Sequence, residues 1–248
     1  MKDNFSKQSE LYARFRPTYP AELYDFFLSI VPGQTAAWDC GTGNGQVAIE
    51  LSKHFDKVLA TDISEQQLKN AVVRENISYS VQRAEETSFE DDTFDLITVG
   101  QAIHWFDFMK FYNEVNRTLN TNGIVAVFGY SLMSIDEKID RIIHHFYENI
   151  VGPYWDSERR YVDDHYQTIP FPFKEIESPT ILAKYDWTLE QFTGYLQTWS
   201  ASGHYIEKNK ENPVDKIIDN LRKCWGNGRT KTITFPIFMR VGMKKPLS

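Results

Sequence analysis

The chain has 248 residues and a formal net charge of −7 at pH 7, with 42% hydrophobic and 15% aromatic residues. This length and composition predict one domain with a full hydrophobic core, and the acidic balance excludes a basic stripe for nucleic acid. Cys40 and Cys224 cannot build a disulfide framework, so a reducing cytoplasm is expected. No apolar run is long enough to cross a bilayer and the N-terminus lacks an apolar signal segment, so no membrane partner is expected.

The N-terminal segment, residues 1–34, is expected to form a cap. Residues 11–20 contain two prolines, which force an extended path, together with arginines and aromatic side chains. That mixture suits a cover over a carboxylate-bearing ligand, although an ordinary N-terminal arm could have the same composition. Residues 21–31 then place apolar side chains on one face, which predicts a short amphipathic helix.

A glycine-rich turn follows, made of Gly41, Gly43 and Gly45, where a predicted strand passes into a predicted helix. Glycines at such a turn allow a tight backbone and leave no side chain in the way of a ligand. The next predicted strand, 57–62, ends in Asp62. This arrangement predicts a nucleoside site, with the glycines under one part of the ligand and a carboxylate on its ribose hydroxyls.

Two alternatives to that nucleoside site remain. A dinucleotide fingerprint would need glycine at position 46, where the chain has Gln46. Asp39, two residues before the first glycine, would repel a pyrophosphate and would attract a ligand that bears a cation, such as an ammonium or a sulfonium. A purely structural glycine turn is the other alternative, which the Asp62 partner disfavours.

Strands and helices are predicted in alternation over the first half of the chain. The expected strands are 35–39, 57–62, 77–82, 94–100 and 124–130, and the expected helices are 45–54, 65–71 and 108–120. This alternation predicts a parallel sheet, whose ligand should lie beyond the carboxyl ends of neighbouring strands. Gln101, His104 and Trp105 follow one such strand and are expected to border the reacting group. A histidine among aromatic residues is more often packed than catalytic, so both roles stay open for His104.

Beyond residue 130 the periodic signal is weaker. A helix is predicted over 135–150, and because its adjacent His144 and His145 face apart, no metal site is expected. Residues 153–179 are rich in proline and aromatic side chains and are expected to cover the pocket. The remaining expectations are a strand at 181–187, a helix at 214–225 and an antiparallel strand at the sheet edge at 230–243.

Four segments of the chain resemble a known enzyme family. The run Asp39–Gly45, D-C-G-T-G-N-G, resembles the first motif of class I S-adenosylmethionine-dependent methyltransferases. Three further patterns resemble the trans-aconitate methyltransferase-like (methyltransferase type 11) group: Y-x-x-x-R-P-x-Y-P at 12–20, Q-A-x-H-W-F-D at 101–107 and T-L-E-Q-x-x-G-Y-L-x-T-W-S at 188–200. The likeness is dense over 12–130 and poor over 135–180.

The resemblance implies an α/β fold: a Rossmann-like, seven-stranded, mostly parallel sheet with helices on both faces and an antiparallel edge strand. It implies one methyltransferase domain over 1–248, with an N-terminal cap and a helical, aromatic insertion after strand five. The expected parts are the cap at 1–34, a cofactor-binding core at 35–130, a substrate-covering insertion at 131–180 and a sheet-completing segment at 181–248.

The resemblance also implies the roles of individual residues. The cofactor-binding residues would be Tyr12, Arg16, Asp39, Gly41, Gly43, Gly45, Asp62, Ile63, Ala84, Glu85 and Gln101. The substrate would contact His104, Trp105, Tyr130 and Trp155, with His104 as the candidate catalytic residue, either as a base or as a group that stays protonated or donates a hydrogen bond.

The implied activity is methyl transfer from S-adenosyl-L-methionine to a small-molecule acceptor, by analogy a carboxylate as in trans-aconitate methylation. Fold and family alone are weak evidence for a substrate. A nucleotide-dependent oxidoreductase and a non-catalytic, cofactor-binding regulatory protein therefore stay open as alternatives. The sequence does not predict an oligomeric state.

Overall fold

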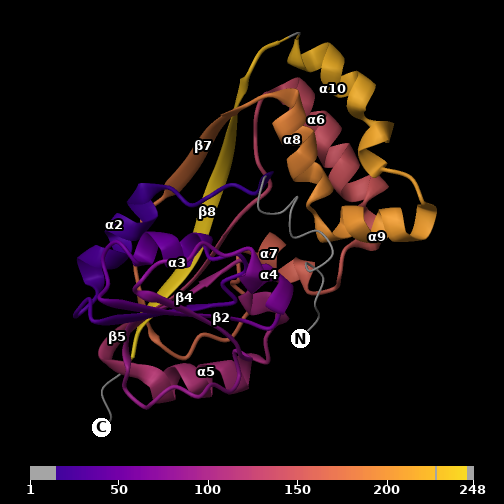
Figure 1. Cartoon of the computed structure of the whole chain (residues 1–248). Helices are drawn as coiled ribbons and strands as arrows, with labels where there is room; N and C mark the ends of the chain where they lie inside the picture. Colours follow the sequence, from indigo (N-terminus) through magenta and orange to yellow (C-terminus); the bar gives the residue numbers. More distant parts are fainter. Residues whose placement is uncertain (1–14, 227, 245–248) are drawn as a thin grey trace.

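The computed structural model describes residues 15–226 and 228–244, and within them one eight-stranded sheet carries helices on both faces (Figure 1). The strands are β1 (Ala36–Cys40), β2 (Lys57–Asp62), β3 (Ile77–Val81), β4 (Phe94–Gly100), β5 (Leu119–Tyr130), β6 (Lys174–Ile176), β7 (Ile181–Trp187) and β8 (Lys231–Met243). The α-helices are α2 (Ala21–Ile30), α3 (Gln46–Leu51), α4 (Glu65–Lys69), α5 (Phe108–Thr118), α6 (Glu137–His145), α7 (Arg159–Asp163), α8 (Leu189–Gln197), α9 (Ser200–Asn209) and α10 (Ile218–Trp225). Short helical turns are η2 (Ile103–Trp105), η3 (Phe146–Ile150), η4 (Gly152–Tyr154) and η5 (Pro213–Lys216).

The sheet order confirms the predicted Rossmann-like fold. The strands run β3-β2-β1-β4-β5-β8-β6, with β7 also paired to β8. The first five are parallel, whereas β8 is antiparallel to β5. Because β1 lies between β2 and β4, the chain leaves β1 and β4 in opposite directions across the sheet, which opens a crevice at their carboxyl ends.

The far side of the sheet differs from the expectation of seven strands with an antiparallel edge. The described sheet has eight strands, and β8 lies inside it rather than at its edge. The reason is its length of 13 residues: one end pairs with β5 and β6, while the other end, Lys231–Ile237, pairs with β7. A strand this long gives two shorter strands a separate place to pair.

Alternate side chains of β1 explain how helices cover both faces. Ala37 packs into the cluster that contains α2 and α3, whereas Trp38 packs into the cluster that contains α5. All five β1 residues are buried, as expected of a central parallel strand. Figure 1 shows α6, α8, α9 and α10 gathered at the end of the sheet where β7 and β8 extend beyond β5.

Several helix boundaries differ from the predicted ones. The helix predicted over 135–150 changes into a π-helical turn at Phe146, and α9 is a separate helix where none was predicted. The helix predicted from 214 is preceded by a 3-10 turn that begins at Pro213, and the α-helix begins only at Ile218. Between the predicted helix 108–120 and the predicted strand 124–130, Asn122 has φ 63° and lies at an irregularity inside β5.

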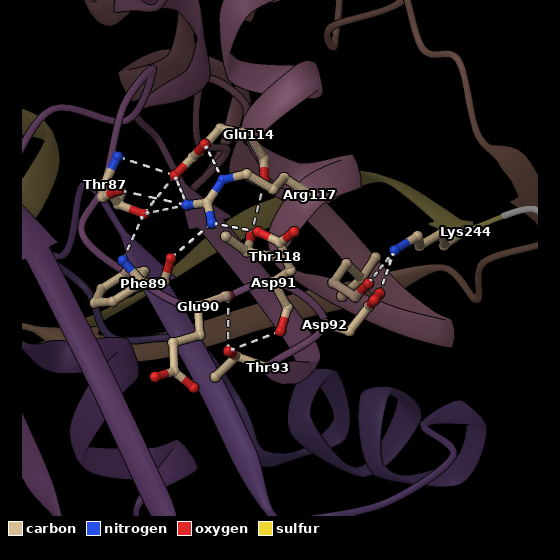
Figure 2. A network of polar contacts seen from close by, with 11 residues as sticks. Thr87, Phe89, Glu90, Asp91, Asp92, Thr93, Glu114, Arg117, Thr118 and Lys244 are labelled. Atoms are coloured by element: carbon tan, nitrogen blue, oxygen red, sulfur yellow. Dashed lines mark hydrogen bonds and ion pairs between the residues drawn. The ribbon is translucent and has the colours of Figure 1, made fainter.

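Helix α5 is tied to the loop between β3 and β4 by a polar network centred on Arg117 (Figure 2). Arg117 contacts Glu114 at 2.6 Å and Asp91 at 2.8 Å, and it donates to the Phe89 carbonyl at 2.6 Å. Glu114 also accepts from the Thr87 backbone N–H at 2.9 Å. This loop directly follows the Ala84–Glu85 turn, so the network holds that turn against the sheet.

Two further observations concern partners. Across 15–226 and 228–244, no group of three or more histidine, cysteine, aspartate or glutamate side chains is arranged to hold a metal ion. No helix in these ranges is long and apolar enough to cross a membrane.

Candidate active site

The crevice at the carboxyl ends of β1 and β4 contains a cavity that combines several of the predicted residues. Its lining includes Asp39, Gly41, Gly43 and Gln101, together with Arg16 and Tyr130. The predicted glycine turn and the residue after β4 therefore border one space, as the strand order requires. We call this space the inner cavity.

Gly43 shapes the inner cavity. Its φ is +56°, which disfavours other residues, and a Cβ at this position would have no heavy atom within 4 Å. Its N–H donates to Asp62 Oδ2 at 2.9 Å, while Asp62 Oδ1 accepts from the Ser64 N–H at 2.8 Å. Asp62 thus connects the end of β2 to the glycine turn. The absence of a side chain at Gly43 therefore leaves open space in which a ligand can lie against the backbone.

Asp39 lies beneath the glycine turn and is tied to it by hydrogen bonds. Its carboxylate is 1% exposed and accepts hydrogen bonds from the Thr42 hydroxyl at 2.5 Å, the Ala48 N–H at 3.1 Å and the Thr98 hydroxyl at 3.0 Å. Burial raises the pKa of Asp39 to about 6, although these hydrogen bonds oppose the rise. Asp39 therefore stabilises the glycine turn. When it is ionised, its negative charge also lies at the wall of the inner cavity.

Gln101 separates the inner cavity from a second one. Its φ is +54°, an unusual conformation for a residue with a side chain. Its N–H donates to the Phe128 carbonyl at 2.8 Å, and its side-chain amide donates to the Tyr130 carbonyl at 3.1 Å. Gln101, Arg16 and Tyr130 border both cavities, so the two spaces are neighbours at this point.

Arg16 closes the two cavities from the N-terminal side. It donates to the Tyr130 hydroxyl at 2.6 Å and to the Thr198 carbonyl at 3.0 Å. The preceding Phe15 lies directly on Gly194 of α8, where a Cβ would be 2.8 Å from its ring. The glycine of the 188–200 pattern therefore makes room for the N-terminal arm. Tyr12, also predicted to bind the cofactor, lies outside the described residues.

The second space, here called the outer cavity, contains all four predicted substrate residues. Its lining is Arg16, Gln101, His104, Trp105, Tyr130, Ser131, Leu132, Trp155, Asp156, Arg159, Tyr195, Trp199 and Ser200. These residues come from the N-terminal arm, the ends of β4 and β5, the insertion and the segment after β7.

His104 is buried in the wall of the outer cavity. Its Nδ1 lies 3.0 Å from the Tyr166 hydroxyl. Burial and, to a smaller extent, the nearby Arg159 charge lower the pKa of His104 to about 3, while Glu158 opposes them. This shift favours a neutral His104 at physiological pH, because the site offers little solvent for the imidazolium.

Arg159, which sequence reasoning missed, lies in the same cavity. Its Nε donates to the Tyr147 hydroxyl at 2.9 Å and to Asp163 Oδ1 at 3.1 Å, and its guanidinium lies 4.6 Å from the Trp155 ring centroid. Among the described residues neither Nη nitrogen has a hydrogen-bond partner, and neither is closed off from solvent. The Trp155 Nε1 is buried without a partner in the same part of the chain. An aromatic segment with consecutive arginines was the only signal for this site.

Four predicted cofactor residues, Asp62, Ile63, Ala84 and Glu85, do not line either cavity. Ile63 follows Asp62 and is half-buried, Ala84 is buried, and Glu85 accepts from the Asp107 N–H at 3.1 Å. Gly45 also lies outside the two linings and has φ +83°, with the Tyr79 hydroxyl packed where its Cβ would be. Glu85 thus joins the turn after β3 to the segment after β4, rather than being a solvated loop acid.

Comparison with known proteins identifies the family. The model described as "Methyltransferase domain" matches residues 38–127. A candidate methyltransferase of Dictyostelium discoideum is 34% identical over 251 residues, which covers 98% of this chain and 95% of that protein. A candidate type II methyltransferase from Anaeromyxobacter dehalogenans is similar in structure, with a TM-score of 0.87 and 33% identity over 94% of this chain and 100% of that one.

A candidate S-adenosylmethionine-dependent methyltransferase of Saccharomyces cerevisiae is more distant, at 22% identity over 260 residues and 89% of each chain. The likeness to the Dictyostelium and Anaeromyxobacter proteins extends over nearly the full length of this chain. The chain belongs to the class I S-adenosylmethionine-dependent methyltransferases.

Proposed function

We propose that this enzyme transfers the methyl group of S-adenosyl-L-methionine to a carboxylate oxygen of a small molecule. The observation that carries the acceptor class is Arg159: a guanidinium anchored along its Nε edge, with its Nη edge accessible at the outer cavity. Such an edge matches the two oxygens of a carboxylate. The resemblance to trans-aconitate methyltransferases supports the same class.

The inner cavity is the proposed cofactor site. The glycine turn has the open direction at Gly43 that a ligand would fill, and Asp39 supplies negative charge close to it. In this proposal Asp62, which the Gly43 and Ser64 N–H groups hold beside the glycine turn, binds the ribose hydroxyls through its carboxylate oxygens. The proposed cofactor residues are Tyr12, Arg16, Asp39, Gly41, Gly43, Gly45, Asp62, Ile63, Ala84, Glu85 and Gln101.

The outer cavity is the proposed acceptor site, and its polar groups are mainly hydrogen-bond donors. The Nη edge of Arg159 and the buried Nε1 of Trp155 lack acceptors among the described residues. Arg16 adds a second positive charge at the junction of the two cavities. An anionic acceptor would supply acceptor atoms to these donors, and of the charged side chains in the lining two are arginines against one carboxylate, Asp156.

The cofactor would supply an electrophilic methyl group on a sulfonium. A carboxylate acceptor is already ionised at neutral pH, so its oxygen needs no proton removed before it attacks. The residues of this chain therefore have to hold and orient the acceptor and exclude water, and good orientation can contribute several kcal/mol. This demand agrees with a neutral His104 that has a pKa of about 3, which would be a weak base.

The two alternatives from the sequence have less support. A nucleotide-dependent oxidoreductase lacks the third fingerprint glycine at Gln46, and the relatives above are described as methyltransferases. A non-catalytic regulatory protein would have no use for an outer cavity with accessible hydrogen-bond donors. Calorimetry with S-adenosylhomocysteine and with NADH separates the oxidoreductase from the methyltransferase.

The experiment that tests the proposal is a methyl-release screen with isotopically labelled cofactor across carboxylates, phenols and amines. We expect transfer to one or more carboxylates and none to amines. Thermal-shift measurements with each compound, made with S-adenosylhomocysteine bound, provide a readout that does not depend on turnover. Transfer confined to phenols or amines would contradict the acceptor class and leave the cofactor assignment intact.

A further inference from the structure

Two consecutive residues after α7, His165 and Tyr166, have an unusual backbone. Their φ angles are +51° and +61°, in the left-handed region that bulky side chains rarely adopt. Several contacts hold this geometry. The Tyr166 N–H donates to the Tyr161 carbonyl at 2.7 Å, and Arg240 donates to the carbonyls of Tyr166 at 3.3 Å and Ile169 at 2.6 Å. A strained pair that neighbouring elements fix so firmly suggests a function.

The strained pair directs both side chains at the wall of the outer cavity. The Tyr166 ring is fully buried against Phe238, with centroids 5.0 Å apart, and its hydroxyl reaches His104 Nδ1. The His165 Nε2 lies 2.9 Å from the hydroxyl of Ser131 at the end of β5. The insertion therefore contacts one cavity residue after β4 and one after β5.

The contact with Tyr166 decides where His104 carries its proton. A neutral imidazole has one N–H and one bare nitrogen. A phenol O–H is a stronger hydrogen-bond donor than a neutral imidazole N–H, and the bare nitrogen is a stronger acceptor than a phenol oxygen. The favoured arrangement is thus donation from the Tyr166 hydroxyl to His104 Nδ1, with the proton of His104 on Nε2.

The other ring nitrogen of His104 is accessible at the cavity. Among the described residues, Nε2 has no hydrogen-bond partner, and it is not closed off from solvent. His104 borders the outer cavity, so this nitrogen can meet a bound molecule. An Nε2–H would then donate to the acceptor oxygen, whereas a bare Nε2 would act as a base.

We propose that Tyr166 is a positioning residue that fixes His104 in the tautomer with its proton on Nε2, so that His104 orients the acceptor through a hydrogen bond and does not remove a proton from it. The tautomer stands by itself, whereas the orienting role rests on the proposed carboxylate acceptor. The strained backbone of His165–Tyr166 is the device that brings the phenol to Nδ1.

Nuclear magnetic resonance tests the tautomer without turnover. In ¹⁵N-labelled enzyme with S-adenosylhomocysteine bound, long-range ¹H–¹⁵N correlations distinguish protonated from bare ring nitrogens, and the signals of His104 are assigned by their loss in His104→Gln. We expect a proton on Nε2 and a bare Nδ1 in the wild type, and a mixture of tautomers in Tyr166→Phe. A proton on Nδ1 in the wild-type enzyme would overturn the proposal.

Kinetics test the role, using the acceptor found in the methyl-release screen. Glutamine places an amide N–H near the position of Nε2, so we expect His104→Gln to keep kcat/KM within about threefold, while His104→Ala loses about tenfold through one missing hydrogen bond. Tyr166→Phe should lower kcat/KM about threefold in the wild-type enzyme. The same substitution should lower kcat/KM little when it is added to His104→Gln. Tyr154→Phe, which removes another insertion hydroxyl, is the control and should match the wild type. Loss of about 100-fold in both His104 variants would indicate a base and overturn the role.

The methyl-release screen and the magnetic resonance spectrum together distinguish a failure of the positioning proposal from a failure of the proposed acceptor class. If carboxylates are not methylated but the wild-type spectrum shows an Nε2 proton, the acceptor class is wrong and the positioning by Tyr166 stands. If carboxylates are methylated and the spectrum shows a bare Nε2, the acceptor class stands and the positioning proposal is wrong.

Discussion

The inner and outer cavities meet at Gln101 but are built in different ways. The inner cavity depends on backbone: a glycine turn directly after β1, fixed by carboxylates at the ends of β1 and β2. The outer cavity depends on side chains such as Arg16, His104 and Arg159, which come from distant parts of the chain. A backbone site suits a cofactor shared across a family, whereas a side-chain site can change its ligand by substitution.

This difference predicts that the effect of a substitution depends on which of the two cavities the substituted residue lines. Changes in the inner cavity should alter cofactor affinity and leave acceptor recognition nearly intact, and changes in the outer cavity should do the reverse. Gln101, Arg16 and Tyr130 are exceptions because they border both spaces. The predictions below test the separation, from the largest expected effect to the smallest.

Arg159→Met should raise the KM for a carboxylate acceptor about 100-fold, because it removes two charge-assisted hydrogen bonds from a desolvated site. Steady-state kinetics measure the KM for the acceptor, and calorimetry with S-adenosylhomocysteine measures the cofactor affinity separately. The cofactor affinity should stay within about twofold of the wild-type value. Arg141→Met, at an exposed position on α6, is the matched control. An unchanged KM in folded Arg159→Met would remove the observation on which the acceptor class depends.

Asp62→Ala should weaken cofactor binding by about tenfold to a hundredfold, since it removes a charged acceptor worth about 1.5–3 kcal/mol. It also releases the Gly43 N–H, so part of the loss reflects a loosened turn. Calorimetry with S-adenosylhomocysteine gives the affinity, and Asp25→Ala on the exposed side of α2 is the control. Wild-type affinity in the folded variant would show that Asp62 is only a structural contact.

Cofactor affinity should depend on pH through Asp39. Burial raises the pKa of Asp39 to about 6, so its negative charge is present above that pH and lost below it. Because a sulfonium favours the ionised carboxylate, affinity should fall about tenfold from pH 7 to pH 5, where about nine-tenths of the groups are protonated. Calorimetry with S-adenosyl-L-methionine, which carries the sulfonium, at pH 7 and at pH 5 checks this. Asp39→Asn should remove most of the pH dependence, and an equally steep profile in that variant would assign the effect to another group.

Gly194→Ala tests the contact that places the N-terminal arm. The added methyl would lie 2.8 Å from the Phe15 ring, so the arm or α8 must shift, at a cost of about 1–3 kcal/mol. We expect a melting temperature lower by a few degrees and a cofactor affinity reduced about threefold, because Arg16 moves with the arm. Phe15→Leu should restore part of both losses in the double variant. No change in either quantity would mean that the arm is not held at this position.

The first half of the fold was predictable because its signals are local. Strands β1, β2, β4 and β5 appeared as apolar runs and β3 as an alternation of apolar and polar residues, and the glycine turn and Asp62 followed from residues close in sequence. Ser64, which caps α4 by accepting from the Gln67 N–H, is a local signal of the same kind. The alternation of strands and helices then indicated which strand ends meet, and Asp39 and Gln101 do line one cavity, whereas His104 lines the next one.

The outer cavity was less predictable because its geometry depends on distant contacts. Arg159 belongs to a helix of five residues with no clear periodicity. Tyr166 has a left-handed φ with no glycine to indicate it, and its position relies on Arg240 of β8. The interior position of β8 also depends on long-range strand pairing, since β8 pairs with β5, β6 and β7. The neutral state of His104 required its burial to be known.

The most direct test of the central claim is the chemical nature of the product. The enzyme is incubated with cofactor labelled in its methyl group and with the acceptor from the carboxylate screen, and the isolated product is treated with mild alkali. A methyl ester releases its label as volatile methanol, and we predict that most of the transferred label is recovered in this form, with far less product from Arg159→Met at the same acceptor concentration. Label that remains in an alkali-stable product, such as a methyl ether or a methylamine, would contradict the account.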